Sequence, residues 1–170
     1  AEIGLRAAMT GHMVLSTLHT NDAISTAMRL LDMGVDNYLV ASSLRAVIAQ
    51  RLIKRLCDHC QEEYQPDEQE KTWLQQMDGS SELLTFRHGR GCHHCNNTGY
   101  SGRVGIYELL EMDEAMISGM RKNSAEEFTQ AAMAHPTFRP LALCALDYAK
   151  QGITSLAEVF RISASLGDGG

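Results

Sequence analysis

Apolar residues recur at helical or strand spacing along the first third of the chain, with glycine and polar residues between the periodic stretches. This pattern predicts three helices and two strands, over residues 1–10 (helix), 13–18 (strand), 23–33 (helix), 36–49 (helix) and 51–56 (strand). Gly11 and Gly34 are suited to end the first two helices, and Asn21 or Asp22 can cap the second. Strands that alternate with helices are typical of an α/β fold.

The last third of the chain has one further strand pattern and then only helical patterns. Residues 103–110 have strand length and composition. Four helices are expected after this strand, over residues 113–121, 124–134, 139–150 and 154–163. Asp113, Ser124 and Thr154 are suitable caps, and Gly152 separates the last two helices.

The middle of the chain, residues 57–99, differs in composition from both flanks. It holds an acidic run, the only tryptophan and turns rich in glycine and asparagine, with one short helix expected over about 67–77. Its ends carry four of the five cysteines as two Cys-x-x-Cys pairs, which are Cys57 with Cys60 and Cys92 with Cys95.

Each of these pairs can aim two thiolates at one ion, and two pairs complete a tetrahedral set of four ligands. The spacing therefore predicts a structural zinc site with Cys57, Cys60, Cys92 and Cys95 as ligands. A closed site of four thiolates leaves no open position for water or substrate. A redox-active pair and a site that has lost its metal are the alternatives.

Other histidines and the fifth cysteine lie near or after this segment. We interpret His59, His93 and His94 as solvated turn residues, because four thiolates already fill the shell of a zinc ion. Cys144 lies in an apolar helical run, where a small buried side chain is the simpler interpretation.

Charge and composition exclude several classes of function. The 170 residues are 44% hydrophobic, with 15 basic and 21 acidic side chains and a net charge of −6. An acidic balance disfavours general binding to nucleic acid, and no apolar run approaches the ~20 residues that span a bilayer. The chain opens with Ala1 inside a helical pattern, so we expect a segment of a longer protein.

Two histidines flank the expected strand over residues 13–18. His12 precedes it, and His19 follows it together with Thr20 and Asn21. Ligands bind at the carboxyl ends of strands in open α/β sheets, and imidazoles can contact phosphate groups. From spacing alone, however, two ordinary histidines remain the simpler interpretation.

The stretch from Gly4 to Ala23 resembles the histidine box of the secretion ATPase superfamily, the hexameric motors of type II secretion and type IV pilus assembly. The resemblance continues through residues 50–52, the two cysteine pairs, residues 99–110 and residues 152–159. The segment over residues 57–99, with a cysteine pair at each end, resembles the assembly and secretion branch of this superfamily. Retraction motors of the superfamily generally lack such a segment. Within that branch, the chain is most similar to the extension ATPases of mannose-sensitive haemagglutinin (MSHA) pili.

This resemblance implies an α/β fold that forms the C-terminal half of a RecA-like P-loop ATPase core, with a zinc-binding insertion and a helical C-terminal subdomain. The implied domains are residues 1–56 (later core), 57–99 (zinc insertion), 100–112 (return strand) and 113–170 (helical subdomain). It also implies a cytoplasmic homo-hexamer peripheral to the inner membrane, working with inner-membrane platform and assembly proteins.

The resemblance implies roles for four residues outside the zinc site. His12 and His19 are the implied catalytic residues, near the phosphates of ATP. Arg103 matches an arginine that helps to hold the nucleotide, and Arg51 matches another family position, where nucleotide contact and packing are equally compatible with the pattern.

The chain departs from the family pattern at its most important motif. It contains no Gly-x-x-x-x-Gly-Lys-[Ser/Thr] loop and no acidic segment that would hold Mg²⁺ before the histidine box. Phosphoryl transfer depends on those parts, so we expect ATP and Mg²⁺ to be cofactors of the full-length protein and the chain alone to be inactive. A zinc-ribbon-like interaction module without ATPase activity is the alternative.

Overall fold

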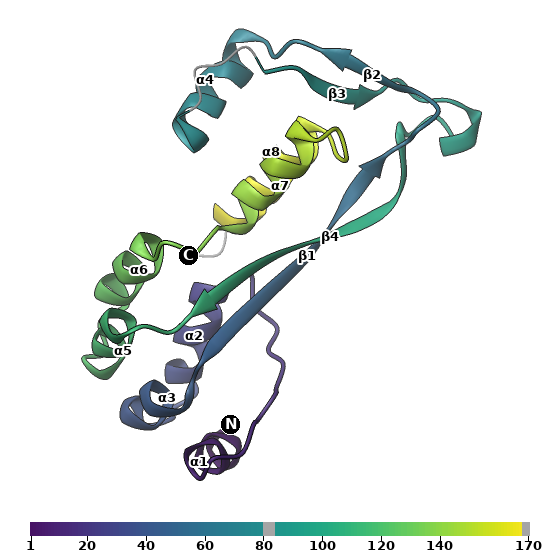
Figure 1. Cartoon of the computed structure of the whole chain (residues 1–170). Helices are drawn as coiled ribbons and strands as arrows, with labels where there is room; N and C mark the ends of the chain where they lie inside the picture. The colour runs from purple at the N-terminus through teal and green to yellow at the C-terminus, as the bar shows by residue number, and fades with distance from the viewer. Residues whose placement is uncertain (80–83, 168–170) are drawn as a thin grey trace. The chain divides into compact units, whose positions relative to one another are not determined.

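The computed structural model describes residues 1–79 and 84–167. Figure 1 shows the elements in chain order: α1 (Glu2–Met9), α2 (Ala23–Asp32), α3 (Asn37–Ser43), β1 (Ala46–Leu56), β2 (Gln61–Tyr64), α4 (Glu68–Asp78), β3 (Phe86–Gly89), the 3₁₀ turn η1 (His93–Cys95), β4 (Tyr100–Glu111), α5 (Glu114–Arg121), α6 (Ala125–Ala134), α7 (Leu141–Lys150) and α8 (Leu156–Gly167). The chain is therefore mixed α/β, as the pattern predicted.

The chain forms two compact units, each made of two separate segments. The first unit combines Ala1–Ala49 with Glu108–Arg139, and the second combines Gln50–Tyr107 with Pro140–Gly170. The functional domains expected from the family resemblance follow different boundaries and stay a prediction.

The described strands form two small sheets. β1 pairs with β4, and β2 pairs with β3 in an antiparallel hairpin whose register runs from Gln61 opposite Gly89 to Tyr64 opposite Phe86. The hairpin and α4 together occupy the excursion between the two cysteine pairs. The described residues of this segment thus belong to the second unit.

Helices supply most of the core of the first unit. Phe128, Met116 and Met120 are fully buried there, together with Leu110 from β4. α5 and α6 approach closely at Gly119, where an added Cβ would lie 2.8 Å from the backbone nitrogen of Phe128. A larger residue would force these two helices apart.

The second unit is held together by the turn between α7 and α8. The amide of Leu56 at the end of β1 donates to the carbonyl of Ile153 at 2.9 Å. The hydroxyl of Thr154 donates to the carbonyl of Lys54 at 2.7 Å. These bonds attach the turn between α7 and α8 to the backbone at the end of β1.

Two expected elements are wrong. Residues 13–18 form no strand, and Met13 and Leu15 are each 89% exposed. A strand is defined by its hydrogen-bonded pairing with another strand, and no described strand pairs with residues 13–18. The helix expected over 36–49 ends at Ser43, because Leu44 is extended (φ −67°, ψ 126°) and β1 begins at Ala46.

The structure confirms most of the helix N-caps predicted from the sequence. The side chains of Asp22, Asp113 and Ser124 accept from the first turns of α2, α5 and α6. Thr154 is the exception, because its hydroxyl bonds to β1, and Ser155 accepts from the amide of Glu158 instead. The cap of α8 is therefore one residue later than expected.

Glu158 is a buried carboxylate in the first turn of α8, with 3% of its surface exposed. It accepts two hydrogen bonds from Arg161 at 3.1 and 3.0 Å and one from the amide of Lys54 at 3.0 Å. Burial by itself raises the pKa of Glu158, but these bonds and the charges of Arg161 and Lys54 outweigh it and hold the pKa below its ordinary value of 4.5. This carboxylate joins α8 to β1.

Replacing Glu158 with glutamine is expected to lower the stability of the second unit at pH 7 by roughly 1–2 kcal/mol, since both cations are about half exposed. The folded pKa lies below the unfolded one, so the contribution is complete above the unfolded pKa and is lost as the pH falls through the folded pKa. The gap between the two proteins in urea unfolding should therefore close below about pH 4.5. Glu68→Gln, at a carboxylate 91% exposed, is the control. A gap that stays constant down to pH 3 would contradict this role.

Candidate functional site

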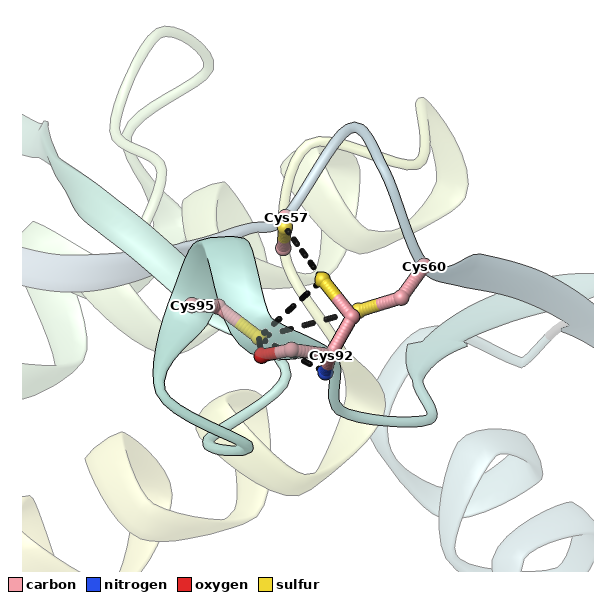
Figure 2. A group of neighbouring side chains, drawn as sticks. All are labelled: Cys57, Cys60, Cys92 and Cys95. Carbon is pink, nitrogen blue, oxygen red and sulfur yellow. Dashed lines mark hydrogen bonds between the residues drawn. The ribbon is translucent and has the colours of Figure 1, made fainter.

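Four thiols from distant parts of the chain converge in the second unit. Cys57 and Cys60 lie in the turn after β1, and Cys92 and Cys95 lie in the turn that contains η1. Figure 2 shows their side chains pointing toward one another. The four Sγ atoms all lie within 4.8 Å of one another. The structure thus brings together all four predicted metal ligands.

The spacing of these sulfur atoms fits a tetrahedral metal ion. The Sγ atoms of Cys57 and Cys92 are 3.9 Å apart, and Cys95 lies 3.8 Å from both Cys60 and Cys92. Zinc–sulfur bonds of about 2.3 Å place tetrahedral ligands about 3.8 Å apart. A disulfide needs about 2.05 Å, and all four cysteines are free thiols. The cluster can therefore bind a metal ion such as zinc.

The two knuckles have the same local turn. The amide of Cys60 donates to the carbonyl of Cys57, and that of Cys95 to the carbonyl of Cys92, each at 3.2 Å. Next to the second knuckle, Gly89 and Gly99 approach so closely that a Cβ on Gly89 would lie 2.1 Å from the carbonyl oxygen of Gly99. Only glycine fits at this crossing, which brings the end of β3 against the start of β4.

The cluster stabilises negative charge on one sulfur. The amides of Cys92 and Gly99 each donate to the Sγ of Cys95 at 3.2 Å. Burial opposes ionisation, but these bonds and those from neighbouring thiols lower the pKa of Cys95 to about 6. Burial raises the pKa of Cys60 to about 12. A bound cation favours the thiolate form of its ligands, so metal binding would remove the protons that the free thiols still hold.

The histidines beside the cluster lie on the surface, as expected. His59, His93 and His94 are exposed, and the ring of His94 stacks on that of His59 and lies tilted to that of His93, each at 4.0 Å between ring centroids. Within residues 1–79 and 84–167, the four cysteines are the only group of three or more Cys, His, Asp or Glu residues arranged to hold a metal. Cys144 is half-buried on α7.

The two histidines expected at the nucleotide belong to the first unit. His12 follows α1, and His19 precedes α2 by four residues, so they occupy the two ends of the open connection that Figure 1 shows between these helices. Both side chains are exposed, and the Nδ1 atom of His12 lies 3.0 Å from the hydroxyl of Thr10. The structure leaves both imidazoles accessible to a ligand.

The two arginines expected at the nucleotide belong to the second unit. Arg51 lies on β1 and Arg103 on β4, the two strands of one sheet. Arg103 is exposed, and Arg51 is partly buried.

The prediction from sequence missed Glu108, a carboxylate with 3% of its surface exposed. It accepts a hydrogen bond from the amide of Ala23, the first residue of α2. The strand pattern contained a signal for it. Residues 106, 108 and 110 alternate along β4 and are all buried on one face, which is otherwise lined by Ile106 and Leu110. A glutamate at the middle position of an apolar face is the signal that could have identified Glu108.

No helix in residues 1–79 or 84–167 has both the length and the apolar character needed to cross a bilayer.

The sequence of this α/β chain matches a known family over most of its length. Residues 1–161 match the family described as "Type II/IV secretion system protein", and the chain belongs to this family.

Similar proteins include the "Type IV pilus assembly ATPase PilB" of Pseudomonas aeruginosa, 44% identical over 167 residues (96% of this chain and 29% of that protein). The "Type II secretion system ATPase E" of Vibrio cholerae serotype O1 is 39% identical over 163 residues (96% of this chain and 32% of that protein). The chain thus spans about a third of the length of these relatives.

A solved structure shows a similar fold. The structure titled "Crystal Structure of the Pilus Retraction Motor PilT and Bound ADP" matches with a TM-score of 0.58 at 24% identity, over 95% of this chain and 35% of that one. At this identity the match supports the fold alone.

Proposed function

We propose that this chain is the C-terminal part of a hexameric ATPase that powers type IV pilus assembly, most similar to that of MSHA pili, or type II secretion. The observation that carries the proposal is the family match along residues 1–161, together with relatives that are 39% and 44% identical and are named ATPases of these two systems. The MSHA assignment rests on the sequence resemblance.

In this proposal the chain forms the later half of a RecA-like core, and its exposed polar residues face the nucleotide. His12 and His19 sense or position the terminal phosphate as donors, and Arg103 neutralises phosphate charge. Arg51 assists Arg103 from the paired strand. The exposure of His12, His19 and Arg103 supports these roles, because a ligand can reach all three side chains.

The metal cluster has a structural role in this proposal. Cys57, Cys60, Cys92 and Cys95 hold Zn²⁺, which leaves no open position for substrate. ATP and Mg²⁺ supply the phosphoryl chemistry in the full-length protein. That protein would work in the cytoplasm, peripheral to the inner membrane, as a homo-hexamer acting on the inner-membrane platform and assembly proteins.

The same proposal makes the isolated chain inactive. No phosphate-binding loop motif and no acidic Mg²⁺ segment occur in the 170 residues. The chain alone should therefore neither bind ATP tightly nor hydrolyse it. ATP turnover by the purified chain above a protein-free blank would contradict this part of the proposal.

A chimera tests the proposed ATPase role. The chain replaces the matching segment of the P. aeruginosa pilus assembly ATPase, to which it is 44% identical. We expect the chimera to hydrolyse ATP, and His19→Ala to lower its kcat by roughly 10²-fold. Arg103→Ala should raise KM or lower kcat, because it removes a charge at the phosphates.

The control variant is Arg6→Ala, whose guanidinium pairs with Glu2 on the surface at 2.7 Å. A surface pair of this kind contributes little, so the control should keep full activity. A folded hexameric chimera without ATPase activity would overturn the proposal. In cells, restoration of MSHA pili rather than secretion by the full-length protein would support the finer assignment, and restoration of secretion alone would refute it.

A further inference from the structure

Glu108 has a buried carboxylate that the proposed function does not use. Glu108 is 3% exposed and lies on β4. Its carboxylate accepts a hydrogen bond from a backbone amide 85 residues earlier in the chain. That amide belongs to Ala23, which is itself fully buried at the start of α2. Burying a carboxylate is costly unless it receives strong hydrogen bonds. Its placement against the end of α2 therefore needs an explanation beyond packing.

The turn that leads into α2 is tightly fixed by its own side chains. Asp22 accepts from the amide of Ser25 at 2.7 Å, and its carbonyl accepts from the hydroxyl of Thr26 at 2.6 Å. The hydroxyls of Thr20 and Thr26 are also hydrogen-bonded to each other. The side chain of Thr20 and the carbonyl of Asp22 are thus both bonded to Thr26 in the first turn of α2, and His19 directly precedes Thr20.

Glu108 ties this turn to the sheet. The first amides of a helix lack partners within the helix, and the positive end of the helix dipole favours a negative charge there. Asp22 satisfies one of these amides from within the turn, and Glu108 satisfies another from β4. The bond from β4 fixes where the whole turn sits relative to the strand.

We propose that Glu108 is a positioning residue for His19, holding the His19–Asp22 turn at the place where the imidazole meets the nucleotide. This inference rests on the proposed function, because it takes His19 as a nucleotide-facing group. Glu108 does not touch the nucleotide itself. It acts through the amide of Ala23 and the hydrogen-bonded turn that joins Ala23 to His19.

The test measures ATP hydrolysis by the active chimera described above with Glu108→Ala and Glu108→Gln. Misplacing a catalytic group by about 1 Å can cost roughly 10²-fold in rate, so Glu108→Ala should lower kcat by roughly 10- to 100-fold with little change in KM. Glutamine keeps an acceptor oxygen but loses the charge, so its effect should be smaller. Glu111→Ala, at the exposed end of the same strand, should leave kcat unchanged.

A double-mutant cycle separates positioning from simple destabilisation. If Glu108 acts through His19, Glu108→Ala should change kcat less than roughly threefold when His19 is already alanine. A purely structural role predicts the same fractional loss in both backgrounds, or loss of folded protein with unchanged kcat per folded molecule. Either of these results would overturn the inference.

A second readout decides the question even if the chimera proves inactive, which would refute the proposed ATPase role. In the 170-residue chain, NMR reports the ring signals of His19 and the amide exchange of Ala23. Glu108→Ala should move the His19 signals and speed exchange at Ala23, while circular dichroism shows an unchanged helix content. Unmoved His19 signals in a folded variant would overturn the inference.

Discussion

Replacing Cys57 and Cys60 with serine is expected to abolish zinc binding and to loosen residues 57–99. Two remaining thiolates cannot hold a tetrahedral ion, and structural zinc contributes an apparent ~10–16 kcal/mol in zinc-finger peptides at pH 7. Three of the Sγ–Sγ distances in this cluster are 3.8–3.9 Å, and all four sulfur atoms lie within 4.8 Å of one another, which matches a closed site. Zinc content by elemental analysis and protease cleavage mapped within 57–99 measure the two effects.

Cys144→Ser is the matched control, because it makes the same substitution at a cysteine outside the cluster. It should retain one zinc ion per chain and the protease resistance of the parent. Chelation of zinc from the parent should reproduce the behaviour of the double variant. Unchanged protease sensitivity after both chelation and mutation would refute a structural metal.

The second large effect is expected from Phe128→Ala, which should destabilise the first unit by about 3–5 kcal/mol. The side chain of Phe128 is fully buried on α6, in the core that also contains Met116 and Met120. Removing the ring leaves a cavity that the close contact of α5 and α6 at Gly119 does not allow to collapse freely. The midpoint of urea unfolding followed by circular dichroism should fall.

The fluorescence of the only tryptophan reports unfolding of the second unit, so it can be compared with the circular dichroism signal of the whole chain. Trp73 lies on α4 in the second unit, with its ring 4.3 Å from that of Phe160. Its fluorescence transition should stay near that of the parent in Phe128→Ala and move in the cysteine variant. Met133→Ala on α6, 58% exposed, should move neither. A shift of both signals by the same amount in Phe128→Ala would show that the chain unfolds as a single unit.

Local sequence signals predicted the elements that carry their own start and stop residues. The helices capped by Asp22, Asp113 and Ser124 begin where expected, because a side chain that bonds a free amide acts over a few residues. The four metal ligands were also predictable, since two short knuckles are defined by spacing alone. These features need no knowledge of distant parts of the chain.

Features that depend on distant partners were not predictable in the same way. The apolar run over 13–18 has the composition of a strand, but a strand exists only where another strand pairs with it. The buried states of Glu108 and Glu158 depend on bonds to residues 85 and 104 positions away. The alternation of residues along β4 indicates that Glu108 lies on the apolar face, but the sequence does not indicate that the amide of Ala23 is its hydrogen-bond donor.

The division of each unit into two separate segments has a consequence for the order of folding during synthesis. The core of the first unit needs Phe128, so residues 1–49 must leave the ribosome and wait for the segment from 108 onward. The second unit waits in the same way for residues of α7 and α8. The cysteine cluster needs only residues up to about Gly99, so it can close before residues 108–139 complete the first unit and residues 140–170 complete the second. A metal ion captured at that stage would shorten the effective loop across which the later segments must find their partners.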